Sequence, residues 1–300
     1  MNGVLIIDKP ASLTSHDVVS RVRRILRERA VGHLGTLDPF ATGVLPLVIG
    51  NLTRLAQFYT KSEKTYEGAI RFGFATDTYD VEGEPTTPVH NVQVSLEEVE
   101  NLAGHFRGSI EQMPPPFSAK KIHGVPAYKL ARRGEAVVLK PVQVEITEFT
   151  ILGVSGEHAN FRARVASGTY MRSLAHDMGQ RLGCGAHLEW LRRTGLGEFD
   201  VSEARTLEQL ADAAQEGTIE EMFVHPRKLL PQMPSVTATD DAVARIRSGR
   251  SVNLPDLSRA RQVKVFHGQR ELLAIATRVA GTLFHPKIVL AGNSPVLAKR

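Results

Sequence analysis

Cysteine is almost absent from this sequence, with one residue, Cys184, among 300. A single cysteine excludes an intrachain disulfide and a thiolate metal cluster. The sequence also lacks any long uncharged apolar run, which excludes a membrane-spanning helix. Its first apolar stretch is short and meets Asp8 and Lys9 too early for a secretory signal peptide. We therefore expect a soluble cytoplasmic protein. Its histidines are scattered and predict no metal site.

Acidic residues are slightly outnumbered. The chain has 37 Lys and Arg against 32 Asp and Glu, for a net charge of +5 and a pI near 9.4. A basic surface favours a polyanionic partner, above all nucleic acid, although many basic proteins bind none. The chain is long enough for one large domain or two smaller ones, each with its own core.

Local signals predict both helices and strands. Thr14 or Ser15 is expected to cap a helix that runs to about Arg29, with one buried face and one basic face turned to solvent or RNA. Ser95 and Glu98 form a capping box for a second helix. Residues 31–46, rich in Gly, Pro, Thr and Asp, are expected to form a long loop. Further expected elements are strands at 66–72, 142–152 and 161–166, and a helix at 172–182.

Three prolines within residues 226–238 indicate a boundary between two domains, 1–232 and 236–300. The second is expected to contain a short helix that Asp240 caps and that ends at Gly249, followed by several strands. A basic insertion is expected at about 113–141, and it is a candidate phosphate-binding arm. The alternative is a solvated run of charge. The arm's candidate RNA-binding residues are Lys120, Lys121, Arg132 and Arg133.

The segment GHLGTLDPFATGVLPLVIG, residues 32–50, holds the main chemical candidate. Its glycines allow close backbone approach to a ligand, and Pro39 stiffens the chain directly after Asp38. A rigidly placed carboxylate suits a nucleophile or a general base. Two alternatives stay open on the residues alone. One is a purely structural Asp-Pro turn, and the other is the Gly-x-x-Gly clamp of a KH domain.

This segment resembles the catalytic motif of the TruB family of pseudouridine synthases, which make pseudouridine in the T loop of tRNA. Four more stretches are similar to family motifs, in the expected order, so that the resemblance spans about residues 3–230. They are LIIDKPASLTSHDVVSRVRRI, EKTYEGAIRFGFATDTYDVEGE, QMPPPFSAKKIHGVPAYKLARRGE and SGTYMRSLAHDMGQRLGCGAHLEWLRRTGLGEF.

The resemblance implies an α+β catalytic domain with a large mixed, mainly antiparallel sheet flanked by helices. Residues 236–300 resemble a PUA domain, a small RNA-binding β-barrel, in position, size and strand pattern. The implied reaction detaches the uracil of uridine 55 from C1′ of the ribose, rotates it and rejoins it through C5. It needs no redox cofactor or metal, and the base is reached by flipping it out of the tRNA fold.

By this resemblance Asp38 is the catalytic carboxylate, and Arg172 is the cation that favours its charged form. Whether Asp38 attacks the sugar or removes a proton from it stays open. Tyr66 is expected to stack on the uracil, and His33 to fill the space that the flipped nucleotide leaves. The remaining substrate-binding candidates are Tyr170 and Leu191, lining the pocket, and Lys9 and Lys64, contacting the site or a phosphate.

Two rival functions stay open. One is a non-catalytic RNA-binding or RNA-folding protein on the same scaffold, against which the intact set of Asp38, Tyr66 and Arg172 argues. The other is guide-dependent modification of other RNA within a partner complex, as in eukaryotic and archaeal relatives. The compact length without lysine-rich tails favours the stand-alone type, a monomer with no obligatory protein partner.

Overall fold

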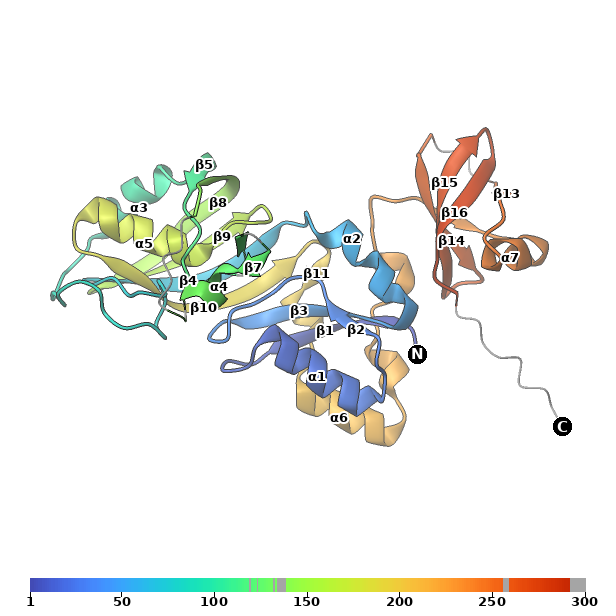
Figure 1. Ribbon diagram of the computed structural model, residues 1–300, viewed down its shortest axis with the longest axis horizontal. Helices are drawn as coiled ribbons and strands as arrows, with labels where there is room; N and C mark the ends of the chain where they lie inside the picture. Colours follow the sequence, from blue (N-terminus) through green and yellow to red (C-terminus); the bar gives the residue numbers. More distant parts are fainter. Residues whose placement is uncertain (119, 123, 132, 134–138, 256–258, 292–300) are drawn as a thin grey trace.

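The protein was analysed as a computed structural model that describes residues 1–118, 120–122, 124–131, 133, 139–255 and 259–291. Its described elements form three sheets, of nine, five and two strands (Figure 1). The nine-stranded sheet runs through the first 200 residues. The five-stranded sheet follows near the C-terminus, and the two-stranded sheet belongs to the basic insertion.

The main path of the large sheet has the strand order β1-β3-β10-β4-β9-β8-β5, with β2 beside β3 and β11 beside β10. Among the described strand pairs of this sheet, β3 and β10 are parallel and the others are antiparallel, which confirms the expected mixed, mainly antiparallel sheet. The strands are β1 Gly3–Lys9, β2 Val31–His33, β3 Thr42–Ile49, β4 Lys64–Phe72, β5 Gly108–Gln112, β8 Val142–Ser155, β9 His158–Val165, β10 Ala186–Leu196 and β11 Phe199–Asp200.

Helices pack on this sheet through apolar faces. Thr14 and Asp17 form a capping box at the start of α1 (Ser15–Leu26), whose Val18 and Val22 are buried in the core. In Figure 1, α1 and α6 (Leu207–Glu216) lie side by side beneath β1 and β3. The other helices of this part are α2 Ala56–Tyr59, α3 Leu96–Gly104 and α5 Met171–Leu182.

Residues 31–46 are not one long loop, so this prediction is wrong. Strands β2 and β3 occupy both ends of the segment, and only residues 34–41 stay irregular. Gly43 lies inside β3 with φ +99°, where an added Cβ would lie 2.2 Å from the Arg193 carbonyl oxygen. The glycine thus permits close strand contact rather than marking a loop. Because Gly32 lies in a strand and no two helices flank the Gly-x-x-Gly segment, the KH alternative is excluded.

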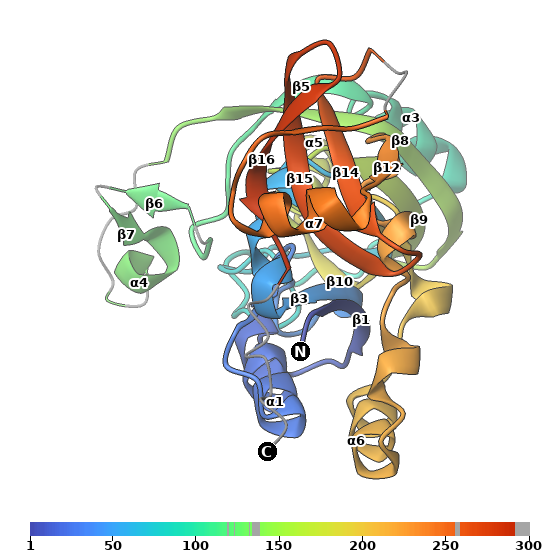
Figure 2. The same cartoon turned by 90° about the vertical axis from the view of Figure 1, so that its right-hand side faces the viewer.

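The C-terminal module is a five-stranded sheet of order β12-β14-β15-β16-β13, with α7 (Asp240–Arg247) packed against it (Figure 2). Thr239, not Asp240, is the N-cap of α7. In the described part of the chain β12 and β13 do not pair, so that the curled sheet forms a half-barrel. Its strands are β12 Ser235–Thr237, β13 Val252–Asn253, β14 Gln262–His267, β15 Glu271–Ala280 and β16 Leu283–Val289.

This module shares a hydrophobic core with the first part of the chain. Phe266 and Ile275 belong to the same buried cluster as Val44 of β3. The buried ammonium of Lys264 donates to the Leu229 carbonyl of the connecting segment at 2.6 Å. The Arg54 guanidinium donates to the carbonyl of Val289 at 2.9 Å. The module is therefore packed onto the first part of the chain and is not a loosely tethered unit.

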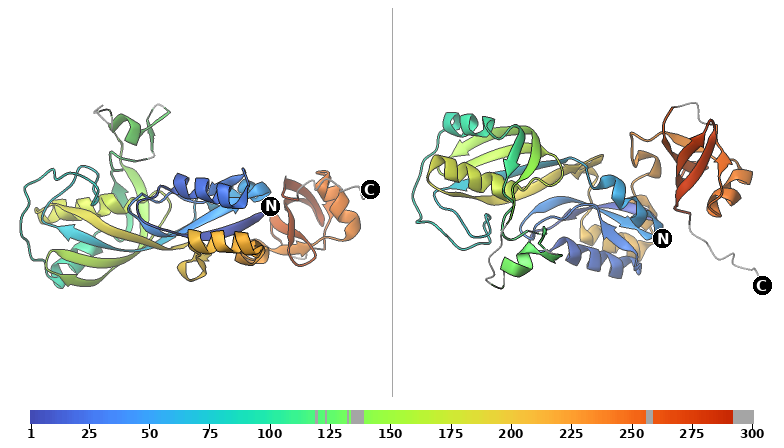
Figure 3. Two further views of the ribbon diagram at one scale, coloured as in Figure 1. Left: turned by 90° about the horizontal axis from the view of Figure 1, so that it is seen from below. Right: turned by 45° about the horizontal axis from the view of Figure 1, so that its top comes forward.

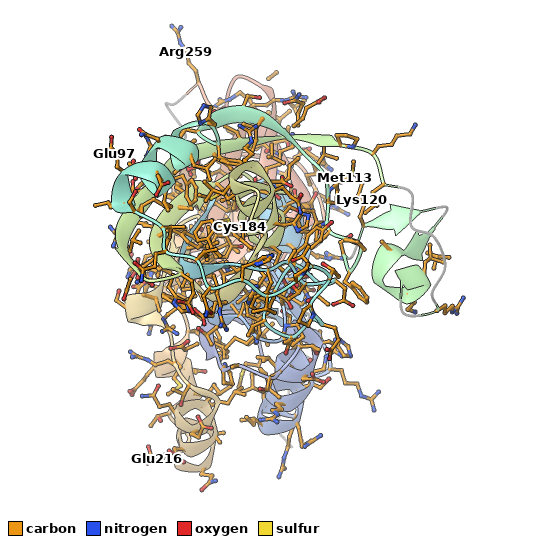
Figure 4. The ribbon with its side chains drawn as sticks, turned by 90° about the vertical axis from the view of Figure 1, so that its left-hand side faces the viewer. Glu97, Met113, Lys120, Cys184, Glu216 and Arg259 are labelled. Carbon is orange, nitrogen blue, oxygen red and sulfur yellow. The ribbon has the colours of Figure 1, made fainter. Side chains whose placement is uncertain are left out.

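The insertion stands off from the body on the side of α1 rather than of α6, as Figures 2 and 3 show. It contains β6 (Lys121–Ile122), β7 (Val125–Pro126) and α4 (Ala127–Ala131). Figure 4 labels Met113 and Lys120 where the chain leaves the body for the insertion. None of the described helices is long and apolar enough to cross a bilayer.

Candidate active site

Asp38 lies on the loop 34–41, which is tied by its backbone to the start of α1. The Leu37 N–H donates to the Ser15 hydroxyl at 2.8 Å, and the Ser12 N–H donates to the Pro39 carbonyl at 2.9 Å. The Ala41 N–H closes a turn onto the Asp38 carbonyl at 3.2 Å. These bonds fix the backbone on both sides of the carboxylate, so its position is set before substrate arrives.

A fully buried guanidinium holds the same loop from the sheet side. Arg193 of β10 donates from Nε to the Val44 carbonyl at 2.7 Å and from Nη2 to the Gly35 carbonyl at 3.0 Å. Burial lowers the pKa of Arg193, and the Tyr66 hydroxyl beside it acts in the opposite direction. Arg193 therefore connects the Asp38 loop to the strand that carries Tyr66. Arg193 was not among the site residues predicted from the sequence.

Lys9 also holds the loop that carries Asp38. The Lys9 side chain is fully buried. Its ammonium donates to the carbonyls of Pro10 at 2.8 Å, Leu13 at 2.6 Å and Pro39 at 3.0 Å. All three donors are thus used by backbone. Of the two contacts expected from the sequence, the site or a phosphate, this geometry gives the first and leaves no donor for the second. Burial lowers the pKa of Lys9 to about 8, against the opposing effect of Asp38.

Lys9 predicts an alkaline limit to activity. Above pH about 8 the ammonium loses a proton, and a neutral amine can no longer donate to three carbonyls. We expect kcat to fall by up to about tenfold per pH unit above that value. The free energy of unfolding should instead rise between pH about 8 and 10.5. In that range the unfolded chain holds this proton while the folded chain has lost it. A pH profile of kcat, with thermal unfolding at each pH, separates the two effects.

The matched variants are Lys9→Met and Lys64→Met. Burial also lowers the pKa of Lys64 to about 8, but its ammonium donates to the Ser62 carbonyl and not to the Asp38 loop. Lys9→Met should show a low, flat profile through pH 8, whereas Lys64→Met should keep the decline. The same decline in Lys9→Met would assign the titration to another group.

Arg172 at the start of α5 faces the Asp38 carboxylate with two nitrogens. Its Nη2 donates to Asp38 Oδ1 at 3.2 Å, and its Nε lies 2.9 Å from Oδ2 as an ion-pair contact without an aligned hydrogen bond. The Arg172 side chain is 6% exposed and that of Asp38 is 36% exposed. The pair is therefore shielded on the arginine side and open to solvent on the carboxylate side, where a ligand can approach.

A second carboxylate, Asp80, lies on the far side of Arg172. Its Oδ2 is 3.4 Å from Arg172 Nη1, and its Oδ1 accepts a 2.6 Å hydrogen bond from the Thr78 hydroxyl. Burial raises the pKa of Asp80, while the Thr78 hydroxyl and Arg172 lower it. Carbonyls of Thr78 and Phe117 complete the surroundings of Arg172 at 3.0 and 2.9 Å. Asp80 lies two residues after Thr78 in the stretch EKTYEGAIRFGFATDTYDVEGE, and the similarity of that stretch to a family motif was the sequence signal that could have identified it.

The aromatic and apolar candidates come from neighbouring strands and from the start of α5. Tyr66 on β4 is 7% exposed and lies opposite Arg193 of β10 in register. Leu191, also buried, lies opposite Gly68 in the same strand pair. Tyr170 directly precedes α5, and the Gln112 side chain holds its backbone at 2.8 and 3.0 Å. These side chains thus belong to elements that converge on the Asp38–Arg172 pair.

His33 ends β2, one residue before the Asp38 loop. Its Nδ1 is buried without a hydrogen-bond partner among the described residues, and burial is the main cause that lowers its pKa. A neutral imidazole next to the loop can contact a nucleotide through its apolar face and offer a free ring nitrogen.

Of the four candidates in the insertion, Arg132 lies outside the described residues, and only the backbone of Lys121 is described. Arg133 is exposed, and Lys120 is half-buried near the stem. The stem itself is joined to the site, because the Ser173 hydroxyl donates to the Met113 carbonyl at 2.6 Å and Arg172 binds the Phe117 carbonyl. The stem of the insertion is therefore held by the same turn of α5 that carries the cation beside Asp38.

The arrangement offers one partly exposed carboxylate, fixed by backbone and facing a shielded guanidinium. Such a carboxylate can attack an electrophilic carbon or accept a proton. The described residues contain no group of three or more His, Cys, Asp and Glu side chains that could hold a metal ion.

Sequence comparisons relate the chain to known proteins along nearly its whole length. Profiles described as "TruB family pseudouridylate synthase (N terminal domain)" and "tRNA pseudouridylate synthase B C-terminal domain" match residues 23–171 and 172–233. A tRNA pseudouridine synthase B from Solibacter usitatus is 51% identical over 97% of this chain and 100% of its own. One from Geobacter sulfurreducens is 41% identical over 83% of this chain and 82% of its own.

Solved structures show the same fold. A chain from an H/ACA ribonucleoprotein bound to a substrate RNA is 24% identical and superposes with a TM-score of 0.72, covering 97% of this chain and 86% of its own. A chain from a Cbf5–Nop10–Gar1 complex is 27% identical with a TM-score of 0.71, covering 96% and 85%.

Proposed function

The chain belongs to the TruB family of pseudouridylate synthases, and from this membership we propose that it converts uridine 55 in the T loop of tRNA to pseudouridine. The observation that carries the proposal is the partly exposed Asp38 carboxylate against the shielded Arg172 guanidinium, on a loop with the family's motif. The curated relatives of similar length are named as tRNA enzymes, which favours tRNA as the substrate. An intact site favours catalysis over RNA binding alone.

The reaction is an isomerisation in which the bond from C1′ to N1 breaks and a bond from C1′ to C5 forms. Asp38 acts in one of two ways. Its carboxylate attacks C1′ and forms an ester while uracil leaves as an anion, or it removes a proton from the sugar while the base departs. The uracil then turns and C5 bonds to C1′. In the first route this breaks the ester and frees the Asp38 carboxylate, and in the second the sugar regains the proton that Asp38 had removed. The C5 proton is then lost while N1 gains one. Arg172 contacts both carboxylate oxygens of Asp38 and orients them toward the sugar.

The neighbouring residues hold the flipped nucleotide. Tyr66 stacks on the uracil, Leu191 and Tyr170 close the pocket around it, and His33 occupies the space that it leaves. Unstacking a base costs a few kcal/mol, which stacking and hydrogen bonding inside the pocket offset. Lys9 and Arg193 act on the chemistry indirectly, because both hold the Asp38 loop through its carbonyls.

RNA binding extends beyond the pocket. We assign the insertion, about 113–141 with Lys120, Lys121, Arg132 and Arg133, to the tRNA backbone, and residues 236–300 to a PUA-like RNA-binding module. We further propose that the protein acts as a cytoplasmic monomer without guide RNA or protein partner, in line with relatives that are named for tRNA alone. The chemistry is redox-neutral and calls for no cofactor.

The test is tritium release from tRNA transcripts labelled at C5 of uridine. Wild-type protein should release one tritium per tRNA, and a transcript with cytidine at position 55 should release none. Replacing another T-arm uridine by cytidine, with pairing preserved, is the control and should leave release intact. Equal release from the position-55 transcript and the unchanged one would overturn the assigned target. No release from any transcript would overturn the activity.

A further inference from the structure

A concentration of positive charge lies at the far end of α1, away from the Asp38 loop. Arg23, Arg24, Arg27 and Arg29 surround a shallow hollow of about 460 Å³, and these four residues are called here the α1 basic patch. All four are exposed. The apolar face of α1 is buried, so this surface is not part of the core.

The patch carries charge that the protein itself leaves uncompensated. Glu28, the acid of the hollow, is engaged by the Ala30 N–H at 3.0 Å and by the N-terminal ammonium at 3.3 Å. Across the described residues, Arg24, Arg27 and Arg29 have no carboxylate within ion-pair distance. Clustered like charges repel one another and lower stability unless an anion joins them.

The needs of the α1 helix account for two of the four arginines in the patch and not for the other two. Arg23 and Arg24 lie in the last turn of α1, where cations are favoured by the helix dipole. Arg27 and Arg29 lie beyond the helix end. Arg27 is the C-cap residue with φ 50° and ψ 35°, a left-handed conformation that glycine takes at lower cost. An arginine at this strained position is not what helix termination alone would select.

The patch also lies where an RNA held at the active site can reach. The helix begins beside Asp38, because Ser15 contacts Leu37, and its 12 residues extend about 18 Å. Figures 2 and 3 place α1 on the same side of the body as the insertion, which is the second candidate RNA-binding segment.

We propose that the α1 basic patch is a second binding surface for the phosphodiester backbone of the substrate tRNA, on a helical stem outside the T loop. The inference rests on the proposed function for its choice of RNA. Segment 20–30 contains guanidinium groups but no Phe, Tyr or Trp to stack on bases. The patch therefore binds phosphates without reading sequence, and it orients the stem while the pocket takes the nucleotide.

The test is direct binding of unmodified tRNA transcript by the full chain over a range of salt concentrations. The variant is R24Q/R27Q/R29Q. We expect its Kd and KM to rise about ten- to a hundredfold at low salt, and the slope of log Kd against log salt to fall by about 2 to 3, one lost phosphate contact per arginine. Because the three side chains are exposed, thermal unfolding should not move to lower temperature.

The matched control is R71Q/R107Q/R162Q, which removes the same charge from arginines already paired with Glu157, Glu100 and Glu67. It should keep the wild-type slope. An unchanged slope in the patch variant, or an equal change in the control, overturns the patch. Tritium release by the wild type is measured separately. If the wild type released no tritium but the patch variant still showed a reduced salt slope, the proposed chemistry would be rejected. The binding role of the α1 basic patch would be retained.

Discussion

Replacing Asp38 by Asn should abolish pseudouridine formation, with kcat falling by at least about 10⁴-fold. An amide cannot attack C1′ as a carboxylate does, and it cannot accept a proton from the sugar, so both routes are lost together. The amide has nearly the same shape, and the backbone bonds of the loop at Leu37, Pro39 and Ala41 do not involve the side chain. We therefore expect tRNA affinity to stay within about threefold of wild type. Single-turnover tritium release and a binding titration on the same preparations measure both quantities.

The control is Asp212→Asn, which makes the same change at an exposed position of α6. It should release tritium at the wild-type rate. If Asp38→Asn retained more than about 1% of the activity, another group would have to supply the carboxylate chemistry.

Replacing Arg172 by Lys should lower kcat by about 10²- to 10³-fold, the next largest expected effect. The guanidinium contacts Asp38, Asp80 and the carbonyls of Thr78 and Phe117 at once, and one ammonium cannot reproduce these directions. The charge is kept, so the loss reports geometry. Asp80 would also remain buried without its partner, which costs stability. Single-turnover kinetics at saturating tRNA, with thermal unfolding beside it, measures the two losses.

Arg181→Lys is the matched control, because Arg181 lies in the last turn of the same helix, over the Phe106 ring. If Arg181→Lys lowered kcat as much as Arg172→Lys, the loss would come from a disturbance of α5 and not from the lost contact to Asp38. A second comparison adds Asp80→Asn to Arg172→Lys. If Asp80 acts through Arg172, the double variant should lose less than the product of the two single losses.

Much of the fold was predictable where its signals are local. Capping residues at Thr14 and at Ser95 with Glu98 predicted the starts of α1 and α3, and the structure confirms both helices. Strand β10 was missed, because its Arg192 and Arg193 suggest an exposed segment. Arg193 is buried only because carbonyls of residues 35, 36 and 44 receive its protons, about 150 residues earlier in the chain. No local pattern contains that information.

The site divides in the same way. The pairing of Asp38 with Arg172 was predicted from the family motifs, and the structure places the two side chains in contact. Lys9 was expected to contact the site or a phosphate, and the structure places its ammonium on the Pro39 carbonyl beside Asp38 and on two further carbonyls. This contact forms only after the loop folds over it. Asp80 lay within a stretch similar to a family motif, but its partner Arg172 lies 92 residues away in sequence. Such roles depend on tertiary contact rather than on spacing.

The position of β10 between β3 and β4 has a consequence for synthesis on the ribosome. Until residue 196 has emerged, the two halves of the large sheet have no common strand, and the carbonyls around Asp38 lack the guanidinium of Arg193. Nascent chains fold as sequence becomes available, and pairings distant in sequence form last. A truncated or stalled chain would therefore carry the carboxylate without a working pocket, so that only a completed sheet can act on RNA.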